Sequence, residues 1–235
     1  MDIINNLDFS EACAMLLPEL YGAFGIVVEV TIVSFILAMI LGILIAFGRL
    51  CKFKTINYIM IFCIEIVRGT PLLVQLVYTY YVIPLLITLL FNIIGLDIEF
   101  KMTPFLAGII GLGVHYGVLL SEVIRSAIMN IDSGQREATL SLGFGETECL
   151  FGIILPQAMR NSVPVFGNYL VTIVKDTSLL AYISLPELLL KTKEITSQTF
   201  LTIESYTILA VIYLIITVPL SRIISLIESR FIKIS

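Results

Sequence analysis

Several polar and ionisable side chains interrupt the apolar stretches of this chain, and together they could bind a small polar solute. Those we assign to a solute pathway on this ground are Asn168, Glu122, His115, Lys175 and Asp176. Such groups are costly in lipid, so inside a membrane they face protein or water. The set contains both hydrogen-bond donors and hydrogen-bond acceptors.

Depth along the helix separates these residues. Asn168 follows Arg160 by eight residues, which places it about 12 Å into the membrane, near the midplane. Lys175 and Asp176 lie about 22 to 24 Å in by the same rise, nearer the outer side. They could pair with each other or with the hydroxyl groups that follow them.

The other ionisable groups could serve a structural role instead of binding a solute. Glu122 lies one turn before Arg125, which favours an ion pair or a gate at the inner mouth. His115 is expected to line the pore or to pack between helices. Glu29 has no evident partner. For the charged residues, pairing between helices and contact with substrate both stay open.

A break is expected near residue 70. Glu65 and Arg68 are three residues apart, so they would be neighbours on a helix. We predict that they form a structural pair that holds a break at Gly69 and Pro71.

Catalytic chemistry and nucleotide binding are not indicated. A phosphate-binding loop of the form GxxxxGK[ST] needs a Gly-Lys pair, and the sequence has none. The only histidine is His115, the four cysteines form no CxxC pair, and no basic block suggests nucleic acid. We therefore expect no enzyme, no metal site and no cofactor in this chain.

The elements that position these residues are predicted to be membrane helices. The 235 residues are 58% hydrophobic and 14% charged, with a mean hydropathy of +1.03, whereas soluble domains are about 25% charged. We expect one all-α integral membrane domain over 1–235. Its five spans are predicted at 22–48, 56–92, 104–124, 162–184 and 205–227. The second is too long for one straight crossing, and its Gly and Pro residues predict a bent or broken helix.

Positive residues set the expected orientation, since Lys and Arg collect in cytoplasmic loops. Nine Lys and Arg would be cytoplasmic if the amino terminus is outside, against three on the other side. The nine are Arg49, Lys52, Lys54, Arg125, Arg136, Arg160, Arg222, Arg230 and Lys233. We expect an outside amino terminus and a cytoplasmic carboxyl terminus.

The connection between the third and fourth spans is too apolar for an ordinary loop. It predicts two short helices over about 133–156, separated by Gly143 and Gly145, with Ser133 as the first N-cap. Phe144, Leu150 and Phe151 would then project into water and need a partner protein. The alternative is an amphipathic segment that lies on the bilayer.

The spacing within this connection resembles a known signature. Glu137-Ala138-Thr139, Gly143, Ile153 and Leu155-Pro156 are similar to the EAA motif of ABC importer permeases, with Thr139 in place of an alanine. Further segments resemble permeases for glutamine, histidine and arginine: Glu65 to Leu72 with Gln75, Glu122 to Arg125, Gly167-Asn168, and Lys175 to Leu179. The similarity covers the chain from about residue 20 onward.

The resemblance implies a fold and a mechanism. It implies a type I (MetI-like) permease core in the bacterial cytoplasmic membrane, with the EAA residues forming a cytoplasmic coupling helix that docks on an ATPase. Glu137 would lie at the helix start, Gly143 would allow a sharp turn and close backbone approach, and Ile153, Leu155 and Pro156 would anchor the segment. Gln75 joins the expected pathway.

The resemblance also implies partners. These are an ABC ATPase dimer that binds ATP and Mg, a second permease chain, identical or not, and an external amino-acid-binding protein. Two rival hypotheses are a secondary transporter, with Glu122 or Asp176 as its coupling carboxylate, and an intramembrane enzyme. The first predicts inverted repeats and usually more spans, and the second needs a nucleophile and base that the sequence does not suggest.

Overall fold

The computed structural model describes residues 7–50 and 53–232, and in this part of the chain every regular element is helical. The prediction of an all-α membrane protein is confirmed. Lys52 and Lys233, which we used for the orientation, lie outside the described residues.

The first helix, α1 (Phe9–Leu50), has 42 residues and is about 63 Å long at 1.5 Å per residue. It extends well beyond the predicted 22–48 and beyond the roughly 30 Å of a bilayer core. Its first half packs against α9 (Leu188–Thr199) and α10 (Thr202–Ile232) through Leu16, Leu20 and Val27. The tertiary contacts of this half explain why the helix continues past the hydrophobic span.

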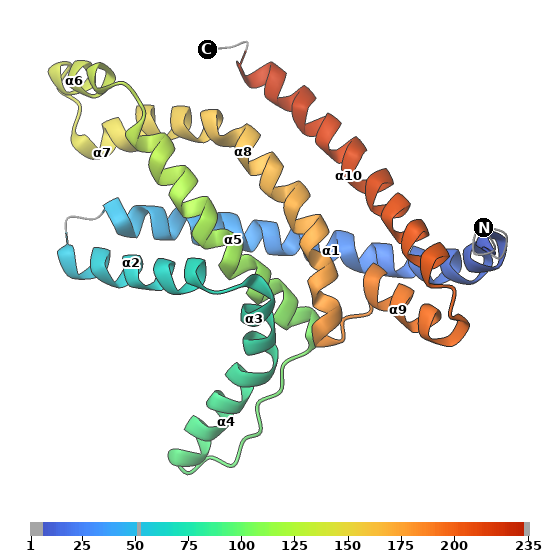
Figure 1. Ribbon diagram of the computed structural model, residues 1–235. Helices are drawn as coiled ribbons and strands as arrows, with labels where there is room; N and C mark the ends of the chain where they lie inside the picture. Colours follow the sequence, from blue (N-terminus) through green and yellow to red (C-terminus); the bar gives the residue numbers. More distant parts are fainter. Residues whose placement is uncertain (1–6, 51–52, 233–235) are drawn as a thin grey trace.

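The predicted second span is divided. Helix α2 (Lys54–Gly69) ends at Thr70, which is extended, and α3 (Leu72–Val77) starts after Pro71 in a new direction (Figure 1). A π-helical turn, η2 (Tyr78–Val82), then leads into α4 (Ile83–Ile93). The break at Gly69 and Pro71 is therefore present, whereas Pro84 lies in the first turn of α4 and does not interrupt the helical run.

Helix α5 (Pro104–Met129) is the centre of the fold, with 12 of its 26 residues buried. It packs so closely on α1 that a Cβ on Gly113 would lie 2.5 Å from Leu37 Cδ2, and one on Gly117 would lie 2.8 Å from Leu41 Cβ. Small residues allow this approach, and membrane helices depend on it because lipid does not drive them together.

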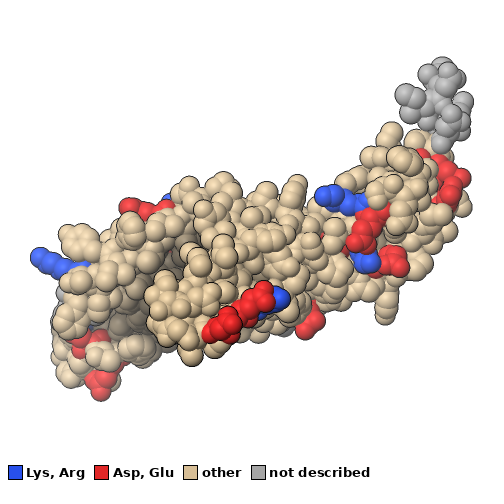
Figure 2. Space-filling model, turned by 90° about the horizontal axis from the view of Figure 1, so that it is seen from below, with Lys and Arg blue, Asp and Glu red and all other residues tan. Residues whose placement is uncertain are grey.

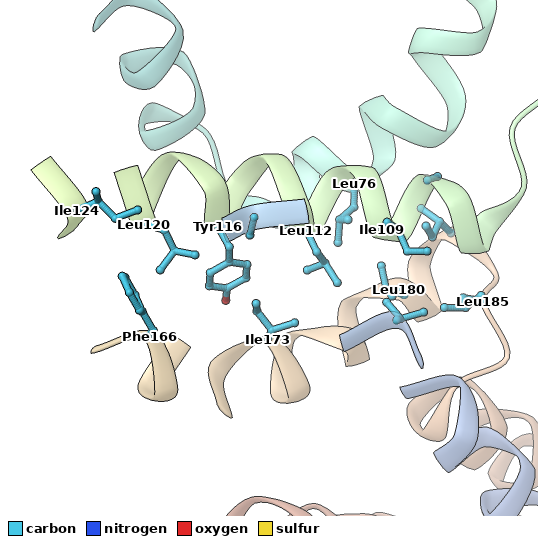
Figure 3. Packing of buried hydrophobic residues seen from close by; sticks show 14 of the residues in the cluster. Leu76, Ile109, Leu112, Tyr116, Leu120, Ile124, Phe166, Ile173, Leu180 and Leu185 are labelled. Carbon is cyan, nitrogen blue, oxygen red and sulfur yellow. The ribbon is translucent and has the colours of Figure 1, made fainter. Parts of the chain in front are cut away.

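The connection after α5 forms α6 (Ser133–Ser141), α7 (Glu146–Cys149) and a π-helical turn, η3 (Leu150–Ile154). Helix α8 (Leu155–Asp176) follows and ends in a 3-10 helix, η4 (Thr177–Ile183). One side of α8 and η4 packs on α5: Phe166, Ile173 and Leu180 point toward the row of apolar side chains on α5 (Figure 3).

Four helices within the described ranges are long and apolar enough to cross a membrane: Phe9–Leu50, Leu72–Ile93, Pro104–Met129 and Thr202–Ser229. The predicted span 162–184 corresponds to the end of α8 and to η4. Helix α8 is not among the four because Arg160, Asn161, Asn168 and Lys175 lower its hydropathy. The count of five spans stays a prediction. Figure 2 shows a face that is mostly uncharged, with charged atoms toward both ends and in one patch near the lower middle.

Candidate functional site: a polar pathway and an exposed coupling segment

Gln75 lies in α3, and its side chain reaches back across the break to the end of α2. Its amide nitrogen lies 2.6 Å from the Val67 carbonyl oxygen, 3.0 Å from that of Thr70 and 2.9 Å from Thr70 Oγ1. These contacts satisfy carbonyl groups that a broken helix leaves without an amide partner. Gln75 Oε1 lies 3.0 Å from Nδ1 of His115 on α5. Two residues that we expected to line the pathway are thus joined, and they hold the break against α5.

The next residue on α5 holds the end of α8. The hydroxyl of Tyr116 donates a hydrogen bond to Asp176 Oδ2, and Tyr116 is 2% exposed. Its ring also contacts those of His115 and Tyr169, with centroids 5.2 and 5.9 Å away. Consecutive residues of α5 therefore bind the two helix interruptions, the α2–α3 break and the junction of α8 with η4. Discontinuous helices of this kind form binding sites in many transporters.

Asn168 and Lys175 are not part of this cluster. Both lie on the exposed side of α8, and no hydrogen bond of either side chain occurs among the described residues. Lys175 and Asp176 do not pair with each other in this region either. Apart from Glu122, the predicted pathway residues thus fall into a polar cluster inside the chain and an open polar face on α8.

Glu122 forms an ion pair with Arg49 at the end of α1. It also lines a groove of about 530 Å³ between α5 and α8, whose other lining residues include Ser126, Asn130, Asn161 and Ser162. The groove lies toward the end of α5 that carries α6. Glu122 is therefore both paired and placed beside a polar space.

The other predicted structural residues behave differently. Glu65 and Arg68 are exposed, and no ion pair joins them within the described chain. The break at Gly69 and Pro71 is instead held by Gln75, because its amide reaches carbonyl groups that a carboxylate cannot bind. Glu29 is exposed on α1, and we find no partner for it in the part of the chain that the structure describes.

The exposed segment between α5 and α8 begins at a cap that differs from our prediction. Asp132, not Ser133, is the N-cap of α6, and its carboxylate accepts from the Gly134 amide at 2.7 Å. The positive end of the helix dipole also stabilises a carboxylate at this position. Glu137 consequently lies in the second turn of α6, exposed beside the exposed Ala138. The expected place of Glu137 at the helix start is wrong.

Gly143 makes the turn between α6 and α7. Its φ is +89°, a left-handed conformation that residues with a Cβ rarely adopt. No atom lies within 4 Å of a Cβ built there, so the turn is present but the close backbone approach does not occur within the chain. Thr139, the departure from the motif, is 4% exposed, and its hydroxyl donates to the Gln135 carbonyl at 2.6 Å.

The end of the segment is anchored by residues partly outside the motif. Ile153 lies in η3, Leu155 begins α8 and Pro156 occupies its first turn. Ile153 and Leu155 are half-buried and Pro156 is exposed. The most buried groups here are Cys149 and Ile154, which the motif does not mark. Their hydrophobicity was the one available signal.

Glu187 is a buried carboxyl that the sequence analysis missed. It caps α9, accepts from the Leu189 and Leu190 amides at 2.9 and 2.8 Å, and lies 3.3 Å from the Tyr213 hydroxyl on α10. Burial raises the pKa of the Glu187 carboxyl to about 7, although these hydrogen bonds act in the opposite direction. Because Ser, Thr, Asp and Asn are the usual N-cap residues, no sequence signal pointed to a Glu cap here.

The fold and these sites define a helical membrane transport subunit: polar groups hold interrupted helices between its spans, and a helix-turn-helix segment stands exposed between two of them. A family model described as the binding-protein-dependent transport system inner membrane component matches residues 38–233. The chain belongs to this family.

Individual relatives agree with the family. The chain is 34% identical over 192 residues to the glutamine transport system permease protein GlnP of Escherichia coli (strain K12), covering 82% of this chain and 83% of the relative. It is 35% identical over 214 residues to the L-cystine transport system permease protein TcyB of Bacillus subtilis (strain 168), covering 91% and 86%.

Solved structures agree as well. A crystal structure of an amino acid ABC transporter with histidines has a TM-score of 0.83 and 28% identity, and covers 96% of this chain and 99% of that one. The MetNI methionine ABC transporter in an inward-facing form has a TM-score of 0.66 at 16% identity, over 89% and 96% of the two chains. The second likeness concerns the fold alone, and it agrees with the predicted MetI-like core.

Proposed function

We propose that this chain is the membrane-spanning permease subunit of an ABC importer and forms the pathway for a polar amino acid across the cytoplasmic membrane. Its family and its relatives, which are permease proteins of glutamine and cystine transport systems, support this function. The amino terminus would be outside and the carboxyl terminus in the cytoplasm.

The partners follow from the same proposal. A cytoplasmic ABC ATPase dimer binds ATP and Mg and hydrolyses the nucleotide, so this chain has no catalytic role of its own. A second permease chain completes the pathway, and an external binding protein delivers the amino acid. We assign two surfaces to the substrate. One is the polar cluster that contains Gln75 and Asp176, and the other is the open face around Asn168.

The observation that carries the proposal is the exposed segment around Gly143. Leu142, Phe144 and Phe151 are 77%, 50% and 53% exposed, and the motif residues Glu137 and Ala138 are exposed beside them. Apolar side chains that gather on a short exposed segment suit a protein partner. An ATPase docked there would supply this partner and would receive the coupling helix.

Replacement of Gly143 tests the coupling. We expect Gly143→Trp to lose co-purification of the ATPase or ATP-driven uptake in vesicles, because a bulky residue is strained at this φ and enlarges the turn. Gly25→Trp is the control, since Gly25 lies on α1 with open space around it, and it should retain both. Uptake by the native chain that needs no ATP and follows an ion gradient would establish a secondary transporter instead.

A further inference from the structure

The last turn of α1 directly contacts the coupling segment, by which we mean α6, α7 and η3. The ring of Phe47 stacks on that of Phe151, with centroids 5.3 Å apart and planes inclined by 22°. Phe151 lies in η3, the π-helical turn that joins α7 to α8. Turns of this type are rare and occur frequently at functional sites. The motif comparison does not mark either phenylalanine.

The same turn of α1 also contacts α5. Arg49 is two residues after Phe47 and pairs with Glu122. The Arg49 side chain is 15% exposed, and its buried Nε has no hydrogen-bond partner in the described structure. A buried guanidinium that is only partly satisfied depends strongly on its remaining carboxylate. Movement of this turn therefore changes the environment of Glu122.

Glu122 is the acidic residue of the groove between α5 and α8. Asn130, Asn161 and Ser162 supply amide and hydroxyl groups to the same space. A carboxylate released from Arg49 could accept hydrogen bonds from an ammonium group there, whereas the paired carboxylate is neutralised.

We propose that Phe47 and Arg49 form a relay from the coupling segment to the groove. A displacement of η3 moves Phe47, the rigid helical turn carries Arg49 with it, and Glu122 is thereby exposed to or withdrawn from the ammonium group of an amino acid. Phe47 and Arg49 are positioning residues in this relay. The inference rests on the proposed function, because it requires an ATPase that moves the segment.

The aromatic contact is tested in the complete complex in proteoliposomes, with its ATPase and binding protein. We expect Phe47→Ala and Phe151→Ala each to lower the amount of amino acid transported per ATP hydrolysed several-fold. The double variant should be no worse than the more impaired single variant, since residues that act through one contact are not additive. Phe47→Leu, which keeps an apolar side chain, should fall between Phe47→Ala and native. Phe62→Ala, an exposed aromatic on α2, should behave as native.

A charge-conserving substitution tests the second contact. Arg49→Gln, which leaves Glu122 without its cation, should uncouple hydrolysis from transport, whereas Arg49→Lys, which keeps a cation beside Glu122, should keep most of the coupling. Native coupling in both phenylalanine variants, multiplied losses in their double variant, or native coupling in Arg49→Gln would overturn the relay. Failure of ATP-driven transport in the native complex would instead overturn the proposed function.

Discussion

At the scale of single residues, the polar groups of this chain satisfy helix ends as much as they offer binding sites. Gln75 holds the end of α2, Asp132 caps α6 and Glu187 caps α9. Each side chain reaches a helix end, and each replaces a hydrogen bond that water would otherwise supply. In or near a membrane this matters more, because an unsatisfied backbone group costs several kcal/mol in lipid.

The Gln75 contacts predict a ranking of two variants. Gln75→Leu should lower the stability of the purified chain by about 1 to 3 kcal/mol, because it leaves the carbonyl groups at the end of α2 without a donor. His115→Phe removes only the contact to Gln75 Oε1 and should cost less. Unfolding by denaturant in detergent measures both. An equal or larger effect of His115→Phe would show that Gln75 does not hold the break.

Glu187 predicts a pH dependence. Its carboxyl has a folded pKa of about 7, above the ordinary 4.5, so the folded chain keeps this proton more tightly than the unfolded chain does. The contribution of Glu187 to the free energy of unfolding is fully present below about pH 4.5. It falls as the pH rises to about 7, by at most about 3 kcal/mol.

Thermal unfolding across this range measures the effect. Glu187→Gln should flatten the decline, because an amide stays neutral. Glu194→Gln, on the exposed side of α9, should leave it unchanged. If the stability of Glu187→Gln declines with pH as steeply as that of the native chain, another group causes the pH dependence.

At the scale of elements, the coupling segment combines a local rule with a tertiary one. Its α6 starts at an Asp cap and ends at a left-handed glycine, which are both short-range features. Its anchoring depends on η3, where Phe151 meets α1 and Ile154 is buried. The segment is thus preformed as a turn and attached to the membrane helices at its second end.

The cap of α6 can be tested against the one that the sequence favoured. Asp132→Ala should destabilise the start of α6 by about 1 kcal/mol and increase hydrogen exchange at the Gly134 and Gln135 amides. Ser133→Ala should have little effect. The reverse result would make Ser133 the cap.

At the scale of the whole molecule, the residues that we assign to the pathway are divided between buried and open surfaces. Tyr116, His115 and Gln75 connect the interior of one chain, whereas Asn168 and Lys175 are exposed on α8. A polar helix face that is exposed within a membrane must meet water or another chain. The second permease chain of the proposed importer would cover this face and complete the pathway.

The open face predicts a change in substrate response. Asn168→Ala should shift the amino acid concentration that gives half-maximal stimulation of ATPase activity upward several-fold without loss of assembly. Removal of the amide deletes both a donor and an acceptor. Glu29→Gln, which changes an exposed group on α1, should leave the concentration dependence as in the native complex. An unchanged response in Asn168→Ala would remove Asn168 from the pathway.

The sequence by itself determined the helical membrane class, the break near Gly69 and Pro71, the turn at Gly143 and the family. These features depend on local hydropathy, on backbone preferences and on spacing within a short segment, so they are readable without a fold. The tertiary structure alone decided which polar groups meet. Arg49 and Glu122 are 73 residues apart, and Tyr116 and Asp176 are 60 apart. Such pairs depend on how each helix is rotated and packed, which its own apolar pattern does not specify when lipid and protein are equally apolar.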